Sequence, residues 1–350
     1  MANIPLISVV MCAYNHGPFI AEAITSILGQ TIQDFEFIII DDGSTDDTLK
    51  IISQFQGQDT RIRVITRENR GVVASVNQGI GLAQGAWVAR MDADDVCTSD
   101  RFEKQLTSLG RTGADICGTW IQLFGTRGNW IKKYPIDHVG IEIEMLFSQP
   151  IGNATVFMKT AYAQSLLYDG YYERAEDYDY FERAMAQGWV FSNLDEPLYL
   201  YRHHSQQTST RHYLMQQDKS QEIRLRYWNR IATKYGLLED EIAEVMKIRD
   251  PHSPSFLNMI LINSAFDKIL NFHGAHYAPL ILSNMTPLYL MCCNRGGDAL
   301  THLKYFFTQW GYAIPPMTQA QFMMISFLKV KPQSQVFSKL RDLYMRFLMK

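Results

Sequence analysis

Three carboxylates, Asp92, Asp94 and Asp95, have the spacing in this chain that most directly suggests chemistry. They follow a short apolar run that begins at Trp87, so we expect them at the carboxyl end of a strand, where open α/β sheets bind their ligands. Carboxylates are preferred ligands of hard divalent cations, so one acid can hold a cation while another contacts a sugar or a diphosphate. The alternative is a solvated acidic turn that caps a helix beginning near Asp100.

A further carboxylate, Asp42, ends another apolar run. In that position it can accept a hydrogen bond from the imide N–H of a nucleobase. Uracil and thymine offer this donor at N3 and guanine at N1, whereas cytosine has none. The alternative is an Asx-type turn that Asp42 forms with Gly43 and Ser44.

The elements that must position these acids alternate along the first part of the chain. The apolar pattern predicts strands over residues 6–11, 35–40, 62–66 and 87–91 and helices over residues 19–30, 48–55 and 72–83. Ser44 and Asp47 indicate a capping box at the start of the second helix. Because strands and helices joined by short loops form parallel sheets, we predict an α/β fold.

Five short motifs occur in one register, and they cover residues 8–15, 40–46, 69–79, 92–95 and 175–179. In this order and spacing, the chain from about residue 5 to residue 210 resembles family 2 of the inverting glycosyltransferases. The resemblance implies a GT-A fold, which is Rossmann-like with a mostly parallel sheet flanked by helices. Two positions depart from the family pattern. Cys12 stands where Pro or Thr is usual, and Val76 where many members have Arg; both lie beside the expected donor pocket, so they concern the identity of the donor.

The resemblance also implies roles for the donor-binding residues. Asp42 recognises uracil, and Tyr14 lies against the ring face, with core packing as the alternative for Tyr14. Asp94 is the predicted ligand of a divalent Mn or Mg ion that bridges the diphosphate oxygens, while Asp92 faces the ribose. Arg70 lies in the loop before a helix and either approaches the donor phosphates or is an exposed, solvated arginine.

Two later residues complete the predicted site. An inverting transfer needs a base that takes the proton of the acceptor hydroxyl, and by resemblance Asp177 fills this role. The alternative is that Glu176 and Asp177 are a pair of acids that caps a helix. Residues 201–204 match a Tyr-Arg-x-His ending that is common in the family, so His204 is predicted to reach the metal or the diphosphate, with a structural histidine as the alternative.

The composition indicates the cellular compartment and the kinds of partner to expect. The net charge of −3 gives no general attraction to nucleic acid, so we expect no nucleic-acid partner. The five cysteines show no C-x-x-C spacing and suggest neither a disulfide framework nor a zinc site, which fits a cytoplasmic protein. No stretch reaches the roughly 18 apolar residues of a spanning helix. Residues 221–224 resemble the start of the Gln-x-x-Arg-Trp motif of processive synthases, but Leu225 follows, so a non-processive enzyme is favoured.

The sequence also predicts how the chain divides into domains. Residues 1–212 form the GT-A domain, with a nucleotide-sugar-binding half over 1–112 and an acceptor half over 113–212, and residues 213–350 form a helical C-terminal region. Near the C-terminus an apolar stripe runs between basic residues and predicts either a peripheral contact with the inner face of the membrane or packing on the protein's own surface. Its members are Phe337, Leu340, Tyr344, Phe347 and Leu348.

These observations predict a metal-dependent, inverting glycosyltransferase that moves one sugar from a nucleotide-diphosphate sugar, UDP-linked, to a hydroxyl of a glycan or lipid-linked glycan in cell-surface polysaccharide assembly. One alternative is a nucleotidyltransferase that makes sugar nucleotides. That class expects a glycine-rich, basic loop after the first strand, whereas residues 14–18 hold one glycine and no lysine. The other alternative is a degenerate nucleotide-sugar or glycan-binding protein, which would be favoured by loss of Asp94 or Asp177; both are present.

Overall fold

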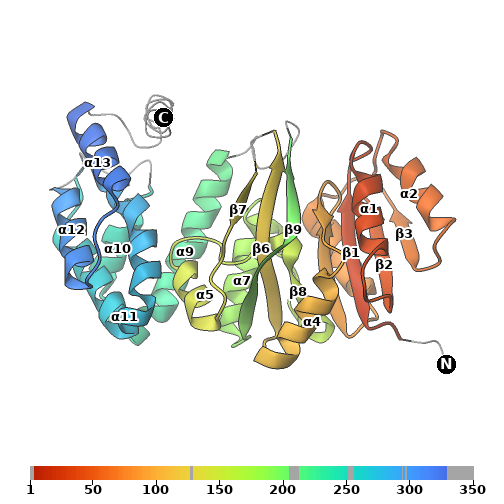
Figure 1. Ribbon diagram of the computed structural model, residues 1–350, viewed down its shortest axis with the longest axis horizontal. Coiled ribbons are helices and arrows are strands. Elements are labelled where there is room, and N and C mark those ends of the chain that lie inside the picture. The colour runs from red at the N-terminus through yellow and green to blue at the C-terminus, as the bar shows by residue number, and fades with distance from the viewer. Residues whose placement is uncertain are drawn as a thin grey trace. The chain divides into compact units, whose positions relative to one another are not determined.

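The computed structural model describes residues 4–126, 129–204, 213–250, 256–293, 295 and 298–328. The chain divides into two compact units, Met1–Ser220 and Gln221–Lys350. The first contains the sheet and the second is helical, as Figure 1 shows. The α/β fold class with a helical C-terminal region is therefore confirmed, whereas the functional halves and the boundary after residue 212 stay predictions.

The first part of the sheet is parallel, with the order β3-β2-β1-β4. Its strands are β1 (Ile7–Ala13), β2 (Phe35–Asp41), β3 (Ile62–Thr66) and β4 (Trp87–Asp92), and the first three are labelled in Figure 1. The connecting helices are α1 (Ile20–Leu28), α2 (Thr48–Gln56), α3 (Val72–Leu82) and, after β4, α4 (Arg101–Thr112). The inner strands β1 and β2 are almost continuously buried because helices cover both faces of a parallel sheet.

The predicted capping box at α2 is wrong. The Ser44 hydroxyl accepts the backbone N–H of Asn15 at 3.0 Å, so it does not cap the helix. The N-cap residue Asp47 makes no side-chain cap either, and Oδ1 of the preceding Asp46 accepts the backbone N–H of Thr48 at 2.9 Å. Ser44 instead ties the loop after β2 to the loop after β1.

The rest of the sheet is mixed. Strand β8 pairs antiparallel with both β4 and β6, and β6 pairs parallel with the long β9. These strands are β5 (Val96–Cys97), β6 (Ile116–Gly125), β7 (Trp130–Lys132), β8 (Phe157–Lys159) and β9 (Phe191–His203). The helices are α5 (His138–Met145), α6 (Thr160–Ser165), α7 (Glu176–Ala186) and two 3-10 turns, η1 (Asn153–Thr155) and η2 (Gly170–Tyr172).

A buried arginine links these two parts of the sheet. Arg101, at the start of α4, donates from Nη2 to the carbonyl oxygens of Arg90 at 2.9 Å and Ala154 at 3.3 Å. Its Nε donates to Gln105, whose amide donates in turn to the carbonyl oxygen of Cys117 at 2.9 Å. One helix terminus thus fixes the spacing between β4, η1 and β6.

The C-terminal unit is built from helices. They are α9 (Tyr213–Tyr235), which begins before the boundary, α10 (Glu239–Lys247), α11 (Met259–Cys292), α12 (Ala299–Gln309) and α13 (Pro316–Leu328). Gly274 interrupts α11 with φ 68° and ψ −168°, a conformation that suits glycine. In the described part of the chain, no helix combines the length and apolar content needed to cross a bilayer. The apolar stripe predicted over residues 337–348 lies outside the described residues.

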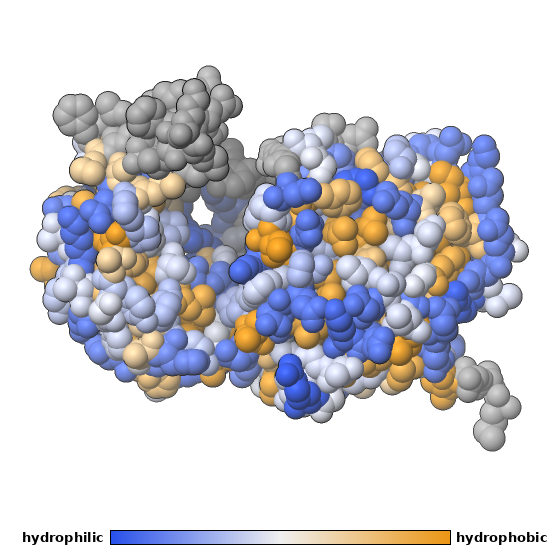
Figure 2. All heavy atoms as spheres, in the orientation of Figure 1, coloured by the Kyte–Doolittle hydropathy of each residue, from blue (hydrophilic) through white to orange (hydrophobic). Residues whose placement is uncertain are grey.

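Hydrophobic and hydrophilic residues are interspersed over the face of the N-terminal unit that Figure 2 shows. The apolar content is instead concentrated inside, in a core that includes Val9 and Met11 of β1, Phe37 of β2 and Phe102 of α4. The sheet is therefore a packed scaffold, and its polar chemistry is confined to the ends of the strands.

Close packing of α3 on β1 gives a first prediction. A Cβ at Gly79 would overlap the Cγ1 of Val10, whereas a Cβ at Gly81, in the same helix, meets no atom within 4 Å. We expect Gly79→Ala to lower the free energy of unfolding by about 1 to 3 kcal/mol through overpacking. The control, Gly81→Ala, should raise it by roughly 0.5 to 1 kcal/mol because alanine is the better helix former. Urea denaturation measures both, and an equal effect of the two changes would contradict the packing.

Candidate functional site

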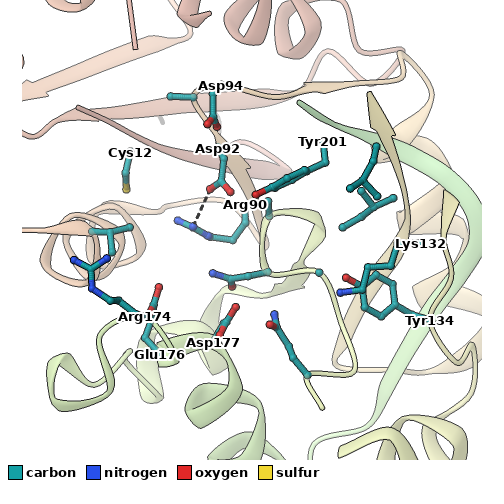
Figure 3. Close-up of a pocket in the computed structure, with 18 of the residues that line it drawn as sticks. Cys12, Arg90, Asp92, Asp94, Lys132, Tyr134, Arg174, Glu176, Asp177 and Tyr201 are labelled. Carbon is teal, nitrogen blue, oxygen red and sulfur yellow. Dashed lines mark hydrogen bonds and ion pairs between the residues drawn. The ribbon is translucent and has the colours of Figure 1, made fainter. Parts of the chain in front are cut away.

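A cleft of about 590 Å³ opens at the carboxyl ends of β1 and β4. Loop, hairpin and helix residues from the second half of the sheet close its other side, as Figure 3 shows. The polar and aromatic side chains that line it are Cys12, His16, Arg90, Asp92, Asp94, Trp130, Lys132, Tyr134, Gln149, Asn153, Glu173, Arg174, Glu176, Asp177 and Tyr201. Four of the predicted site residues therefore share one cavity: Cys12, Asp92, Asp94 and Asp177.

Asp94 lies between two imidazoles. Its Oδ2 is 3.0 Å from Nε2 of His204 and 3.9 Å from Nε2 of His16. The predicted partners Asp94 and His204 are thus in contact although 110 residues separate them in the chain. The ring of Phe19 packs against the His204 ring with a centroid distance of 4.5 Å, which holds the imidazole in place.

Asp92 occupies the wall of the cleft next to Arg90. Its Oδ1 lies 3.3 Å from Nη2 of the buried guanidinium. Partial desolvation raises the pKa of Asp92, the Arg90 charge opposes this, and the neighbouring Asp94 raises it further. Arg90 and Asp92 therefore form an ion pair beside a second carboxylate, that of Asp94.

The third acid of the run, Asp95, faces away from the cleft. Its side chain is 1% exposed, and its Oδ1 accepts the backbone N–H of Arg202 at 2.7 Å. In return, Nε of Arg202 donates to the carbonyl oxygen of Asp94 at 2.9 Å. Burial, followed by repulsion from Asp94 and Asp92, raises the pKa of Asp95 well above its ordinary value. Asp95 therefore holds the loop that carries Asp94.

The acids and histidines fit a divalent ion only together with a bound ligand. Among the described residues, no group of three or more His, Cys, Asp or Glu side chains is arranged to hold a metal. Mg²⁺, however, is commonly held by one or two carboxylates plus substrate phosphates. Asp94 and His204 offer an oxygen and a ring nitrogen 3.0 Å apart, so they suit an ion whose other ligands come from a diphosphate.

Asp177 and Glu176 enter the cleft from the first turn of α7. Oδ1 of Asp177 accepts the backbone N–H of Tyr178 at 2.7 Å. Desolvation raises the pKa of Asp177, while that N–H and the side chain of Gln149 lower it. Burial and then repulsion from Asp177 raise the pKa of Glu176 to about 7. In Figure 3 the Asp177 carboxylate faces Asp92 from the opposite side of the cavity.

The predicted nucleobase residues form a separate group in the loops that follow β1 to β3. Oδ1 of Asp42 accepts the backbone N–H of Arg70 at 3.0 Å and pairs with Nη2 of Arg67 at 2.9 Å. Its Oδ2 accepts the backbone N–H of Gly71 at 2.8 Å, which leaves that oxygen one lone pair. Tyr14 is 46% exposed near this group. None of Tyr14, Asp42 and Arg70 lines the cleft among the described residues.

Cys12, in contrast, lines the cleft at the end of β1. Burial is the main cause that raises the pKa of its thiol to about 11. The side chain is therefore a protonated, neutral wall of the cavity near neutral pH, and not a nucleophile.

The sequence reasoning missed five charged cleft residues: Arg90, Lys132, Glu173, Arg174 and Glu176. Arg90 interrupts the buried apolar run of β4, and a charge at such a position is a usable signal of function. Glu176 was considered only as the neighbour of the base. Lys132 comes from the short β7, which has no sequence signal that would place it opposite Asp177.

Comparisons with known proteins agree with this geometry. The profile described as "Glycosyl transferase family 2" matches residues 8–165. An uncharacterised glycosyltransferase of Haemophilus influenzae is 34% identical over 251 residues, which cover 68% of this chain and 77% of that protein.

Two solved structures share the fold. TarS of S. aureus, residues 1–349 in complex with UDP-GlcNAc, superposes with a TM-score of 0.52 at 16% identity over 88% of this chain and 93% of that one. A mannosyltransferase of Pyrobaculum calidifontis in complex with GDP-Man and Mn²⁺ superposes with a TM-score of 0.50 at 14% identity over 97% of this chain and 84% of that one.

The raised pKa of Glu176 gives a prediction about stability. The group binds its proton more tightly in the folded chain than at its ordinary value of 4.5, so stability falls as the pH rises from about 4.5 to about 7 and stays lowered above that. Glu176→Gln removes this penalty. We expect it to stabilise the fold at pH 8 by roughly 1 to 3 kcal/mol, below the full linkage value because the side chain is only partly buried.

Thermal unfolding at pH 5 and pH 8 measures this difference. The gain from Glu176→Gln should be clearly smaller at pH 5. Glu173→Gln, a change of an exposed acid three residues earlier, is the control and should show the same small effect at both pH values. An equal gain from Glu176→Gln at the two pH values would contradict the raised pKa.

Proposed function

Because the chain belongs to glycosyltransferase family 2, we propose that it moves one sugar, with inversion at the anomeric carbon, from a UDP-linked sugar to a hydroxyl of a glycan or lipid-linked glycan. We place this reaction in the assembly of cell-surface polysaccharide, on the cytoplasmic side. The observation that carries the proposal is the single cleft in which Asp92 and Asp94 face Asp177. The family assignment gives no support to the nucleotidyltransferase alternative.

In this proposal Asp177 is the base. Its carboxylate takes the proton from the acceptor hydroxyl as that oxygen attacks the anomeric carbon opposite the leaving diphosphate. The raised pKa makes Asp177 a stronger base than an ordinary aspartate, while the N–H of Tyr178 keeps one oxygen oriented. Positioned proton transfer of this kind typically contributes a factor of about 10² to 10⁴.

Asp94 and His204 would hold the divalent Mn or Mg ion. When bound, such an ion supplies Lewis-acid stabilisation of the charge on the departing diphosphate. The contacts of Arg202 fix the loop that carries Asp94, and His16 provides a further imidazole on the same side. The Mn²⁺ in the Pyrobaculum calidifontis mannosyltransferase, which has the same fold, supports this role.

The nucleoside would bind in the loops that follow β1 to β3. The remaining lone pair of Asp42 Oδ2 can accept the N3–H of uracil, and the exposed ring of Tyr14 can cover the base. Asp92 would face the ribose, Cys12 would contact the donor from the end of β1, and the exposed Arg70 side chain would approach the phosphates. UDP-GlcNAc bound to TarS supports a uridine donor, although GDP-Man bound to the mannosyltransferase shows that the fold also accepts guanosine.

A donor screen tests the function as a whole. We expect UDP-sugars to stabilise the protein against thermal unfolding in the presence of Mn²⁺, by about 2.7 kcal/mol at 100 times the dissociation constant. GDP- and dTDP-sugars serve as the comparison. If no UDP-sugar stabilised the protein, the proposed donor would be wrong.

The metal role gives a prediction for Asp94→Asn. The change is nearly isosteric but removes the charge that holds the ion, so Mn²⁺-dependent binding of UDP should be lost while the fold persists. Isothermal titration calorimetry with and without Mn²⁺ measures this, with circular dichroism as the check on folding. The control Asp47→Asn changes an exposed acid at the start of α2 and should leave binding unaltered. If Asp94→Asn still bound UDP in a Mn²⁺-dependent way, Asp94 would not be a ligand of the metal.

The role of the base gives a prediction for Asp177→Asn. Nucleotide and metal binding should persist because the proposal gives this carboxylate neither partner, whereas transfer should fall by at least a factor of about 10². Turnover of the tightest-binding UDP-sugar measures the loss, and NMR of the wild-type product gives the anomeric configuration. A retained configuration would refute the single displacement, and full activity of Asp177→Asn would move the base to another residue.

A further inference from the structure

The floor of the cleft holds polar atoms that nothing in the described protein satisfies. They include Nε and Nη1 of Arg90 and Oε2 of Glu176, which are buried without a hydrogen-bond partner, as is Nη1 of Arg174, which lies beside Glu176 in Figure 3. An unpaired buried donor or acceptor costs about 1 to 3 kcal/mol. Arg90, whose side chain is 1% exposed, bears this cost twice. Because these residues line the cleft, a bound ligand is the natural source of the missing partners.

The side chains of Arg90 and Glu176 approach the same part of the cavity from different elements. Arg90 comes from β4 and Glu176 from the first residue of α7, and Figure 3 shows the carboxylate of Glu176 below the guanidinium. Among the ion pairs of the described residues, Arg90 pairs with Asp92 and not with Glu176. A gap therefore separates a free donor from a free acceptor.

This gap lies where the transferred sugar must sit under the proposed function. In the proposed function Asp92 on one side faces the donor, and Asp177 on the other side takes the proton of the acceptor hydroxyl that attacks the anomeric carbon. The mechanism itself assigns no role to Arg90 or Glu176. Because Arg90 and Glu176 lie between Asp92 and Asp177, we expect them to contact the sugar ring of the donor and not its nucleoside or diphosphate.

We infer that one hydroxyl group of the transferred sugar bridges Arg90 and Glu176 and that this bridge selects among donor sugars; the inference rests on the proposed function. A hydroxyl is suited to the gap because it accepts a hydrogen bond and donates one at the same time. It accepts from Nε or Nη1 of Arg90 and donates to Oε2 of Glu176. Arg90 and Glu176 thereby determine donor specificity without taking part in bond breaking.

The experiment compares binding of UDP with binding of UDP-sugars, in Mn²⁺, by calorimetry. The probes are UDP, UDP-glucose, UDP-galactose, UDP-GlcNAc and UDP-glucuronic acid. In Glu176→Ala we expect the tightest UDP-sugar to bind about tenfold more weakly, the effect of one hydrogen bond to a charged group, while the affinity for UDP stays within about twofold. The control Asp47→Ala should change neither affinity.

Monodeoxy analogues of the tightest UDP-sugar identify the bridging hydroxyl. One analogue should bind wild-type protein about tenfold more weakly than the parent UDP-sugar does. The same analogue should bind Glu176→Ala as tightly as the parent sugar does, because the two changes remove the same contact. Arg90→Met should give the same pattern, and if that variant does not fold, the Glu176→Ala data decide alone. Equal losses of affinity for every analogue in both proteins would overturn the inference. If wild-type protein bound UDP but bound no UDP-sugar more tightly than UDP, the inference alone would be overturned. If it did not bind UDP, the proposed function would be overturned as well.

Discussion

The site depends on one reciprocal contact between the ends of two distant strands. Asp95 accepts the backbone N–H of Arg202, and Arg202 donates from its side chain to the carbonyl oxygen of Asp94. The contact fastens the loop after β4 to the end of β9, and two residues farther along the chain His204 reaches Asp94. Burial and the neighbouring acids Asp94 and Asp92 disfavour the charged form of Asp95, so this contact forms in spite of unfavourable electrostatics. The fold is therefore organised to hold Asp94 in one position.

The same cost recurs across the cleft, where the pKa values of Asp92, Asp177 and Glu176 are all raised. A protein selected only for stability would not gather these groups, because each loses hydration and repels the next. Arg101 and Gln105 help to sustain the arrangement, since they tie β4 to β6 through buried hydrogen bonds. The stability needed to hold the acids together thus comes from the mixed part of the sheet and its helices.

The sequence predicted the parallel strands because each is a buried apolar run that ends in polar residues, and Asp92 and Asp94 follow from the same logic. Asp177, at the start of α7, was predicted only from the family resemblance. The two-residue β5 and three-residue β8 are too short for any period to show. Asp95 could not be separated from its neighbours because its partner, Arg202, is remote in sequence. Ser44 has the spacing of a helix cap, but a tertiary contact with Asn15 takes its hydroxyl. Local patterns located the elements, whereas long-range hydrogen bonds decided the roles.

Under the proposed function, different segments of the chain recognise the parts of the substrate. Asp42 is held by the loop before α3, outside the cleft, whereas Arg90 and Glu176 lie at its floor. The aromatic and basic residues Trp130 and Lys132 come from β7, which pairs only with β6 among the described strands. A change in β7 can therefore alter one wall of the cleft without moving the strands that hold Asp92 and Asp94. Such independence would allow one scaffold to keep its donor chemistry while the acceptor changes.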